Sequence, residues 1–167
     1  MALGRHAGGA SGHAVGMAGD TDDDARVRRP GANGHRTVPH TADVRVEAWG
    51  ASREQCLVEA VLGMVECFAD LSGQRATAVR QVQVAECSDD DLLAALLDEV
   101  VFRLEVDGDV PVDVEVEAVE GGLDVRMAVT DVRSVPVIGA VPKAVSWHEL
   151  RLAPGPYGWS CAVTVDV

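Results

Sequence analysis

The residues of this chain best suited to chemistry lie at its end and near position 40. Asp166 is followed by Val167, so a side-chain carboxylate and the carboxylate of the chain end are neighbours. This compact group of hard oxygens suits Ca²⁺, Mg²⁺ or Mn²⁺ better than Zn²⁺. Far upstream, Asp43 closes a His-Thr-Ala-Asp string that begins at His40. If the fold brings Asp43 beside Asp166, the cluster becomes a candidate site for a divalent cation.

The charge of the chain restricts the partners that it can bind. The 167 residues carry a formal net charge of −13, and residues 37–167 hold nine Lys plus Arg against 23 Asp plus Glu, which is −14 for this part. Nucleic-acid affinity comes largely from Lys and Arg side chains that neutralise phosphates, so direct binding of RNA or DNA is not expected. A cation or a basic protein partner suits such a surface better.

The cysteines and the apolar runs indicate the compartment. No Cys-x-x-Cys pair occurs, and all four cysteines lie in apolar stretches, so they are expected to be buried, reduced thiols. They are Cys56, Cys67, Cys87 and Cys161. No apolar run reaches the roughly 18 residues of a membrane span, and the N-terminal segment lacks the apolar core of a signal peptide. These observations predict a cytoplasmic protein with no membrane partner.

Residues 1–36 differ in composition from the rest of the chain. They are rich in Gly, Ala, Asp and Arg and contain few large apolar side chains. Such a segment cannot bury enough surface to offset the entropy of ordering. We therefore predict a disordered tail over residues 1–36 and one domain over residues 37–167. His6, His13 and His35 fall in the tail and are interpreted as solvated residues without a function.

The first part of the predicted domain alternates strand and helix patterns. Residues 43–48 alternate apolar with charged side chains, which indicates a half-buried strand. Ser52, with Gln55 three positions later, predicts a helix N-terminus, and apolar residues recur at helical spacing over residues 57–71. Residues 78–87 are rich in β-branched side chains and predict a second strand.

A second helix is predicted to begin after Ser88 and to end at Asp107-Gly108. Residues 89–91 are three aspartates in its first turn, where their charge complements the positive end of the helix dipole. A cation site made by these three aspartates is the alternative. It is less favoured because consecutive first-turn residues point in different directions.

The remainder of the chain is expected to be strands. They cover residues 112–117, 123–132, 143–152 and 159–167, with Gly121-Gly122 as a hairpin turn. The order β-α-β-α-β-β-β-β predicts an α+β fold, in which two amphipathic helices cover one face of a largely antiparallel mixed β-sheet.

Five short segments, in this order, resemble the archease family. They are His40-Thr41-Ala42-Asp43-Val44, Ala48-Trp49-Gly50, Leu97-Asp98-Glu99, Lys143-Ala144-Val145-Ser146-Trp147-His148 and Val165-Asp166-Val167. The resemblance covers residues 38–167 and implies an archease-like fold. The sequence departs from the family pattern at Pro39, which stands in place of an acidic residue, and at Pro142. Because Pro142 removes a backbone donor and suits an edge strand or bulge, it can alter how Lys143 projects.

The resemblance implies a non-catalytic role. Archeases are protein cofactors of the RtcB-type RNA ligase, which joins RNA ends in tRNA splicing and RNA repair with GTP and Mn²⁺. They promote guanylylation of the ligase and its multiple turnover, and they carry a divalent cation, here expected to be Ca²⁺, with Mg²⁺ or Mn²⁺ as alternatives. Carried over by position, the metal ligands are Asp43, Asp166 and the C-terminal oxygens of Val167. Lys143 is implied to be a functional contact near the metal. On chemical grounds, a neutral His40 could orient the carboxylate of Asp43.

Two other functions remain open from the sequence. The first is a chaperone-like modulator of another RNA-modifying enzyme, such as a tRNA methyltransferase. The second is a small metal-dependent hydrolase that uses His40 and His148, which is disfavoured because no nucleophile or glycine-rich phosphate loop accompanies them. The tryptophans, Trp49, Trp147 and Trp159, are expected to pack on strand faces, where an exposed one could anchor a protein partner.

Overall fold

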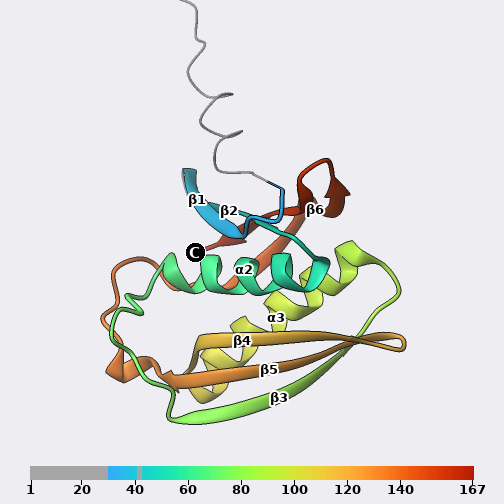
Figure 1. Cartoon of the computed structure of the whole chain (residues 1–167). Coiled ribbons are helices and arrows are strands. Elements are labelled where there is room, and N and C mark those ends of the chain that lie inside the picture. Colours follow the sequence, from blue (N-terminus) through green and yellow to red (C-terminus); the bar gives the residue numbers. More distant parts are fainter. Residues whose placement is uncertain (1–29, 41–42) are drawn as a thin grey trace, which may run out of the picture.

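The computed structural model describes residues 30–40 and 43–167, which form three layers (Figure 1). One outer layer is a sheet with the strand order β1-β2-β7-β6, and the other is a sheet with the order β3-β5-β4. The first sheet consists of β1 (Gly34–His40), β2 (Asp43–Gly50), β7 (Gly158–Asp166) and β6 (Ala144–Gly155). The second consists of β3 (Ala78–Ala85), β5 (Gly122–Asp131) and β4 (Asp109–Val119). The middle layer holds α2 (Arg53–Glu66) and α3 (Asp89–Asp107), and a 3₁₀ turn spans Val132–Ser134.

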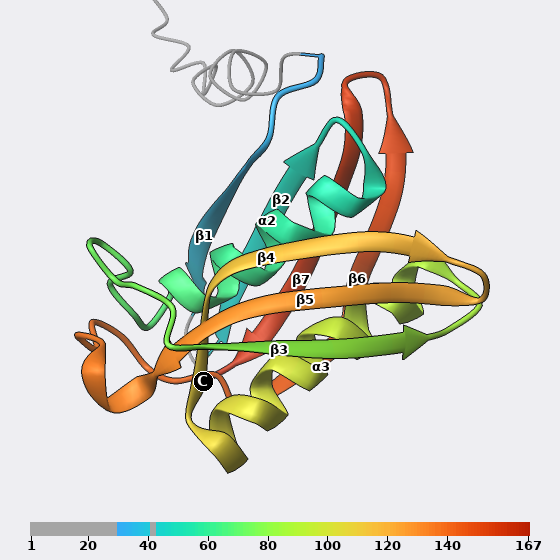
Figure 2. The same ribbon diagram turned by 60° about the horizontal axis from the view of Figure 1, so that its bottom comes forward.

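The helices lie between the two sheets (Figure 1), and the turned view shows them behind the sheet of β3, β5 and β4 (Figure 2). Helix α2 packs on β2 and on β4, and α3 packs on β6 and on β4. The α+β class is confirmed, and every strand pairing in the described residues is antiparallel. The expectation that both helices cover one face of a single sheet is wrong. Their apolar arcs are too wide for one contact, since Leu92, Leu93 and Ala94 are all buried on consecutive positions of α3.

The predicted helix starts are confirmed by their capping hydrogen bonds. The Ser52 hydroxyl accepts from the Gln55 N–H at 3.1 Å, and the Ser88 hydroxyl accepts from the Asp91 N–H at 3.1 Å. Gly108 ends α3 in the left-handed region, at φ 70°, where a residue without Cβ is favoured. Helix α2 ends at Glu66, five residues earlier than the apolar pattern predicts.

The acidic run at the start of α3 has structural partners. Asp89 forms an ion pair of 2.9 Å with Arg53 in the first turn of α2. Asp90 accepts a hydrogen bond of 2.8 Å from the Leu152 N–H in β6. The carboxylates of Asp89 and Asp90 therefore tie α3 to two different elements, as the capping interpretation expects, and they do not converge on a cation.

The folded part begins earlier than predicted. Strand β1 starts at Gly34, so residues 34–36 belong to the sheet and not to the predicted tail. A Cβ at Gly34 would lie 2.5 Å from the Trp49 ring, so glycine is required for this strand to pair closely with β2. Residues 1–29, with His6 and His13, lie outside the described residues. In the described part, no helix is long and apolar enough to cross a membrane.

The cysteines only partly follow the expectation of burial. Cys56 and Cys161 are buried and Cys67 is half-buried, but Cys87 is exposed in the connection between β3 and α3. A hydrogen bond with the Cys161 thiol and burial both raise the pKa of Cys56. Burial raises the pKa of Cys67 to about 11. The prediction was wrong for Cys87 because this residue follows the end of β3 and stands between the polar residues Glu86 and Ser88.

The difference in exposure between Cys87 and the buried cysteines predicts that thiol reagents will modify Cys87 selectively. Since the thiolate is the reactive form, iodoacetamide should modify Cys87 on the order of 100 times faster than Cys56 or Cys161 in the native protein. Mass spectrometry of timed samples measures the rates at each site. In the Cys87→Ser variant the fast phase should vanish, and in guanidinium all the remaining thiols should react alike. Equal native rates at Cys87 and Cys56 would contradict the burial described here.

Candidate metal centre

Two of the predicted metal ligands are direct neighbours in the sheet. Asp43 begins β2, Asp166 ends β7, and they are paired in the antiparallel register. Residues opposed in this way have Cβ atoms about 4.5 to 5.5 Å apart on the same face. Val165, the neighbour of Asp166, is 1% exposed and faces the helices, so the aspartates belong to the outer face. We call Asp43, Asp166 and the carboxylate of Val167 the acidic corner.

Strand β6 brings Lys143 to the same place. The Lys143 N–H donates to the main-chain oxygen of Asp166 at 2.8 Å, and the next residue, Ala144, is paired with Asp166. Lys143 is exposed and is the single lysine of the chain. Pro142 is buried just before this edge strand, outside its ladder, so its missing donor costs no hydrogen bond between strands. The fold therefore keeps the Lys143 backbone bonded to the acidic corner.

His40 lies in the same row of the sheet. It ends β1 and is paired with Asp43, so the register runs from His40 through Asp43 and Asp166 to Ala144 across four strands. Thr41 and Ala42, which connect the first two, lie outside the described residues, as does the side chain of His40. The predicted role of His40 as a partner of Asp43 stays a prediction, with the backbone register in its favour.

Besides the single ammonium group of Lys143, the acidic corner has little fixed positive charge near it. Arg45 lies two residues along β2 on the same face, but its guanidinium group contacts Glu47 at 3.5 Å and Glu149 at 3.8 Å. Like charges directly opposite in a sheet destabilise it, by an amount of the same order as the 0.2–1 kcal/mol of a favourable pair. A cation from solution would remove this repulsion.

The donor atoms fit a hard cation. Carboxylate oxygens from two strands and a chain end are the ligands preferred by Ca²⁺ and Mg²⁺. In the described residues, no three His, Cys, Asp or Glu side chains converge to hold a metal. A site at the acidic corner would therefore need a further donor besides the two aspartate side chains, and the family resemblance implies the carboxylate of Val167 in that role.

The alternative of a metal-dependent hydrolase, which would use His148, gains no support from the geometry of this residue. His148 lies on β6 with its side chain 85% exposed, and its ring contacts Glu149 at 3.7 Å and no residue of the acidic corner. A catalytic histidine is expected to be held beside a metal or a nucleophile. The geometry of His148 matches neither arrangement.

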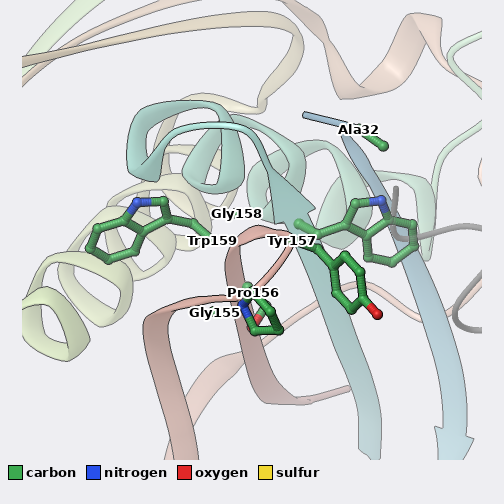
Figure 3. A pocket seen from close by; sticks show the side chains of 8 residues that line it. Ala32, Gly155, Pro156, Tyr157, Gly158 and Trp159 are labelled. Carbon is green, nitrogen blue, oxygen red and sulfur yellow. The ribbon is translucent and has the colours of Figure 1, made fainter. Parts of the chain in front are cut away.

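The far end of the same sheet contains a small aromatic cavity (Figure 3). Its lining includes Trp49, Tyr157 and Trp159 around the turn between β6 and β7, although the Trp159 ring points away from the Tyr157 ring, and its volume is about 70 Å³. A space of this size is large enough to hold ordered water molecules. Trp49 and Trp159 pack as expected for core and rim aromatics, whereas Trp147 is 59% exposed.

One charged cluster was missed by the sequence analysis. The Nδ1 atom of His35 lies 2.7 Å from a Glu59 carboxylate oxygen, and its Nε2 atom contacts Glu66. The ring lies over Gly63, where an added Cβ would approach it to 3.1 Å. Burial lowers the pKa of His35, but hydrogen bonds to the two glutamates outweigh this effect and raise it. Glu59, Gly63 and Glu66 share one face of α2, which is the only signal that the sequence offered.

The protein is thus an α+β protein with a pair of carboxylates at the end of one sheet, and comparisons with known proteins identify the family of its fold. The model of the Archease protein family matches residues 35–167. A probable archease of Mycobacterium tuberculosis is 50% identical over 140 residues, 83% of this chain and 78% of the relative. The archease of Archaeoglobus fulgidus is 30% identical over 138 residues, 80% of this chain and 98% of the relative. The chain belongs to the archease family.

Solved structures support the fold. The solution structure of protein 1598 of Methanobacterium thermoautotrophicum matches with a TM-score of 0.66 and 23% identity, over 80% of this chain and 99% of that one. A crystal structure from Thermotoga maritima, described as an archease and possible chaperone, matches with a TM-score of 0.58 and 19% identity, over 78% of this chain and 94% of that one. At these identities the likeness shows the fold alone.

Proposed function

We propose that this chain is a non-catalytic cofactor of an RtcB-type RNA ligase in the cytoplasm. It promotes guanylylation of the ligase and its multiple turnover in tRNA splicing and RNA repair, and it binds a divalent cation, Ca²⁺ before Mg²⁺ or Mn²⁺. The observation that carries the proposal is the direct pairing of Asp43 with Asp166, next to the carboxylate of Val167. These are the residues at which the family resemblance puts the metal ligands.

The residues of the acidic corner have distinct roles in this proposal. Asp43, Asp166 and the Val167 carboxylate hold the cation, and His40 orients Asp43. A bound divalent cation supplies the positive charge that joins the ends of β2 and β7. Lys143 is free to reach a nucleotide phosphate in the partner, since the hydrogen bond that holds this residue at Asp166 uses its backbone and leaves the ammonium group available.

The charge of the chain supports a protein partner over a nucleic acid. Residues 37–167 carry nine Lys plus Arg against 23 Asp plus Glu, so phosphate backbones are repelled over most of the surface. An RNA ligase must present a basic surface to its substrate, and this surface attracts an acidic protein. The chain therefore contacts the enzyme, while the enzyme contacts the RNA.

The test is a ligation assay with a purified RtcB-type ligase, GTP, Mn²⁺ and an RNA with a 3′-phosphate. Substoichiometric amounts of this chain should increase guanylylated ligase and convert a single turnover into multiple turnovers. Lys143→Ala should reduce this stimulation at least tenfold if it contacts the nucleotide. A matched control is Arg126→Ala, which removes an exposed cation from the other sheet. No stimulation by the unaltered chain would contradict the proposal.

A second candidate is a chaperone-like modulator of another RNA-modifying enzyme, such as a tRNA methyltransferase. The description of the Thermotoga maritima archease as a possible chaperone favours it. Affinity capture from an extract of the native host, followed by mass spectrometry, separates the two. Recovery of an RNA ligase supports the first candidate, and recovery of a methyltransferase without the ligase supports the second.

A further inference from the structure

Strand β6 contains a large bulge close to the acidic corner. Ser146 is paired with Thr164 of β7, but the next paired residue of β6 is Arg151, opposite Ala162. The four residues 147–150 of β6 thus face the single residue Val163 of β7. Bulges at sheet edges re-aim side chains and prevent another strand from pairing. Since β6 is an edge of its sheet, this edge is closed to strand addition over the bulge.

The bulge is strained but held at both ends. Glu149 has a φ of 57°, a left-handed conformation that is costly for a residue with a side chain. The Glu149 carboxylate contacts Arg45 at 3.8 Å, and the Ser146 hydroxyl accepts from the His148 N–H at 3.3 Å. Leu150 is 9% exposed and anchors the end of the bulge in the core. The surrounding contacts therefore impose this shape on the backbone.

The bulge presents a tryptophan to solvent. Trp147 is 59% exposed, whereas Trp49 is 7% exposed in the same sheet. Trp147 lies three residues after Ala144, which is paired with Asp166, so the exposed ring and the acidic corner lie on neighbouring parts of one sheet end. Tryptophan is the residue type most enriched among side chains that dominate protein interfaces. An exposed indole that a fixed bulge directs to solvent is therefore a candidate contact for a binding partner.

We propose that Trp147 is the apolar anchor through which the acidic corner docks on its protein partner. The partner surface that fits has an apolar pocket for the indole ring, bordered by Arg or Lys side chains that face Asp43, Asp166 and Glu149. This proposal rests on the proposed function, under which the partner is the RNA ligase. It adds the side chain that holds the two proteins together and the chemistry of the pocket that receives it.

The charges near Trp147 argue for a protein and against RNA or a membrane. A base that stacks on tryptophan, or an anionic headgroup beside it, brings phosphates that need Lys or Arg neighbours. Around the bulge and the acidic corner, carboxylates outnumber cationic side chains, and Arg45 already contacts two glutamates. The carboxylates are those of Asp43, Glu47, Glu149, Asp166 and Val167, against Arg45, Lys143 and Arg151. Arg and Lys side chains of a protein match this surface, and an apolar pocket matches the ring.

The experiment measures binding of a purified RtcB-type ligase to the full chain and three variants. Trp147→Ala should weaken binding about 30-fold, the effect expected of a dominant interface residue. Trp147→Phe, which keeps an aromatic anchor, should weaken it less than about fivefold. Tyr157→Ala is the matched control, because Tyr157 is an aromatic residue that is 47% exposed at the other end of the β6 and β7 hairpin. It should bind like the unaltered chain, and all variants should keep the same affinity for Ca²⁺.

Each outcome decides the proposal. A loss of ligase binding in Trp147→Ala but not in Tyr157→Ala, with Ca²⁺ binding retained, supports the proposal. Binding of Trp147→Ala within threefold of the unaltered chain overturns it, as does an equal loss in Tyr157→Ala. If the unaltered chain does not bind the ligase at all, the proposed function itself fails, and this result is distinct from a failure of the anchor.

Discussion

Replacing Asp166 by Asn is expected to weaken Ca²⁺ binding at least a hundredfold. The substitution keeps the shape of the side chain and removes one of the negative charges that face each other across β2 and β7. The remaining oxygen of the amide is a weaker ligand for a hard cation than a carboxylate. Asp43→Asn should have a similar effect, because the two side chains contribute to one site. Titration calorimetry with Ca²⁺, Mg²⁺ and Mn²⁺ on chelator-treated protein measures the affinities.

In the absence of metal, the same substitution is expected to stabilise the folded protein. Asp166→Asn relieves the repulsion of paired carboxylates, so the metal-free variant should be more stable than the unaltered protein by about 0.2–1 kcal/mol. With Ca²⁺ in excess the order should reverse, since the unaltered chain binds more tightly and gains more free energy from binding. Glu117→Gln, which removes an exposed charge from β4 in the other sheet, is the control for net charge. Unchanged Ca²⁺ affinity in both aspartate variants would sink the metal assignment.

The second large effect is a pH-dependent stabilisation of β1 by His35. Only the protonated ring can donate from both nitrogens, and Nδ1 and Nε2 each face a glutamate of α2. Although burial lowers the pKa of His35, the hydrogen bonds to Glu59 and Glu66 raise it above its ordinary value of 6.5. The stabilisation is therefore fully present below the unfolded pKa of 6.5 and is lost as pH rises through the higher folded pKa.

Because Glu66 is partly exposed, we expect His35→Ala to cost about 1–2 kcal/mol at pH 5.5 and much less at pH 8.5. Denaturant unfolding at several pH values measures this difference, and proton NMR of the imidazole gives the pKa of His35 directly. Glu66→Gln should remove part of the pH dependence, and Gly63→Ala should displace the ring from between its two partners. Equal losses in His35→Ala at both pH values would contradict the proposed protonation.

Much of the secondary structure could be predicted because its signals are local. Ser52 and Ser88 cap their helices through hydrogen bonds to N–H groups three residues away, and Gly108 ends α3 in a conformation that glycine favours. The three aspartates after Ser88 indicate a helix start for the same reason. The end of α2 was predicted less well. Phe68 is buried just beyond Glu66, so apolar residues continue after the helical hydrogen bonds have stopped.

The arrangement of layers depended on tertiary packing. Periodicity shows that a helix has an apolar face, but not whether the rest of its surface is also covered. Successive residues of α3 are buried because a sheet covers the helices on each side. The early start of β1 has a similar cause, because residues 34–36 contain no strand pattern and are ordered by their pairing with β2 and by the contacts of His35 with α2.

By itself the sequence determined the α+β class, the helix starts, the hairpin turns and, through short motifs, the archease family with Asp43, Asp166, Val167 and Lys143 as candidate residues. The tertiary structure decided that Asp43 and Asp166 are paired, that the Lys143 backbone joins them, that His35 contacts two glutamates, and that a bulge exposes Trp147. The reason is the range of the interactions. Caps and turns involve residues up to four positions apart, whereas the register of β2, β7 and β6 depends on burying both sheets against the same two helices.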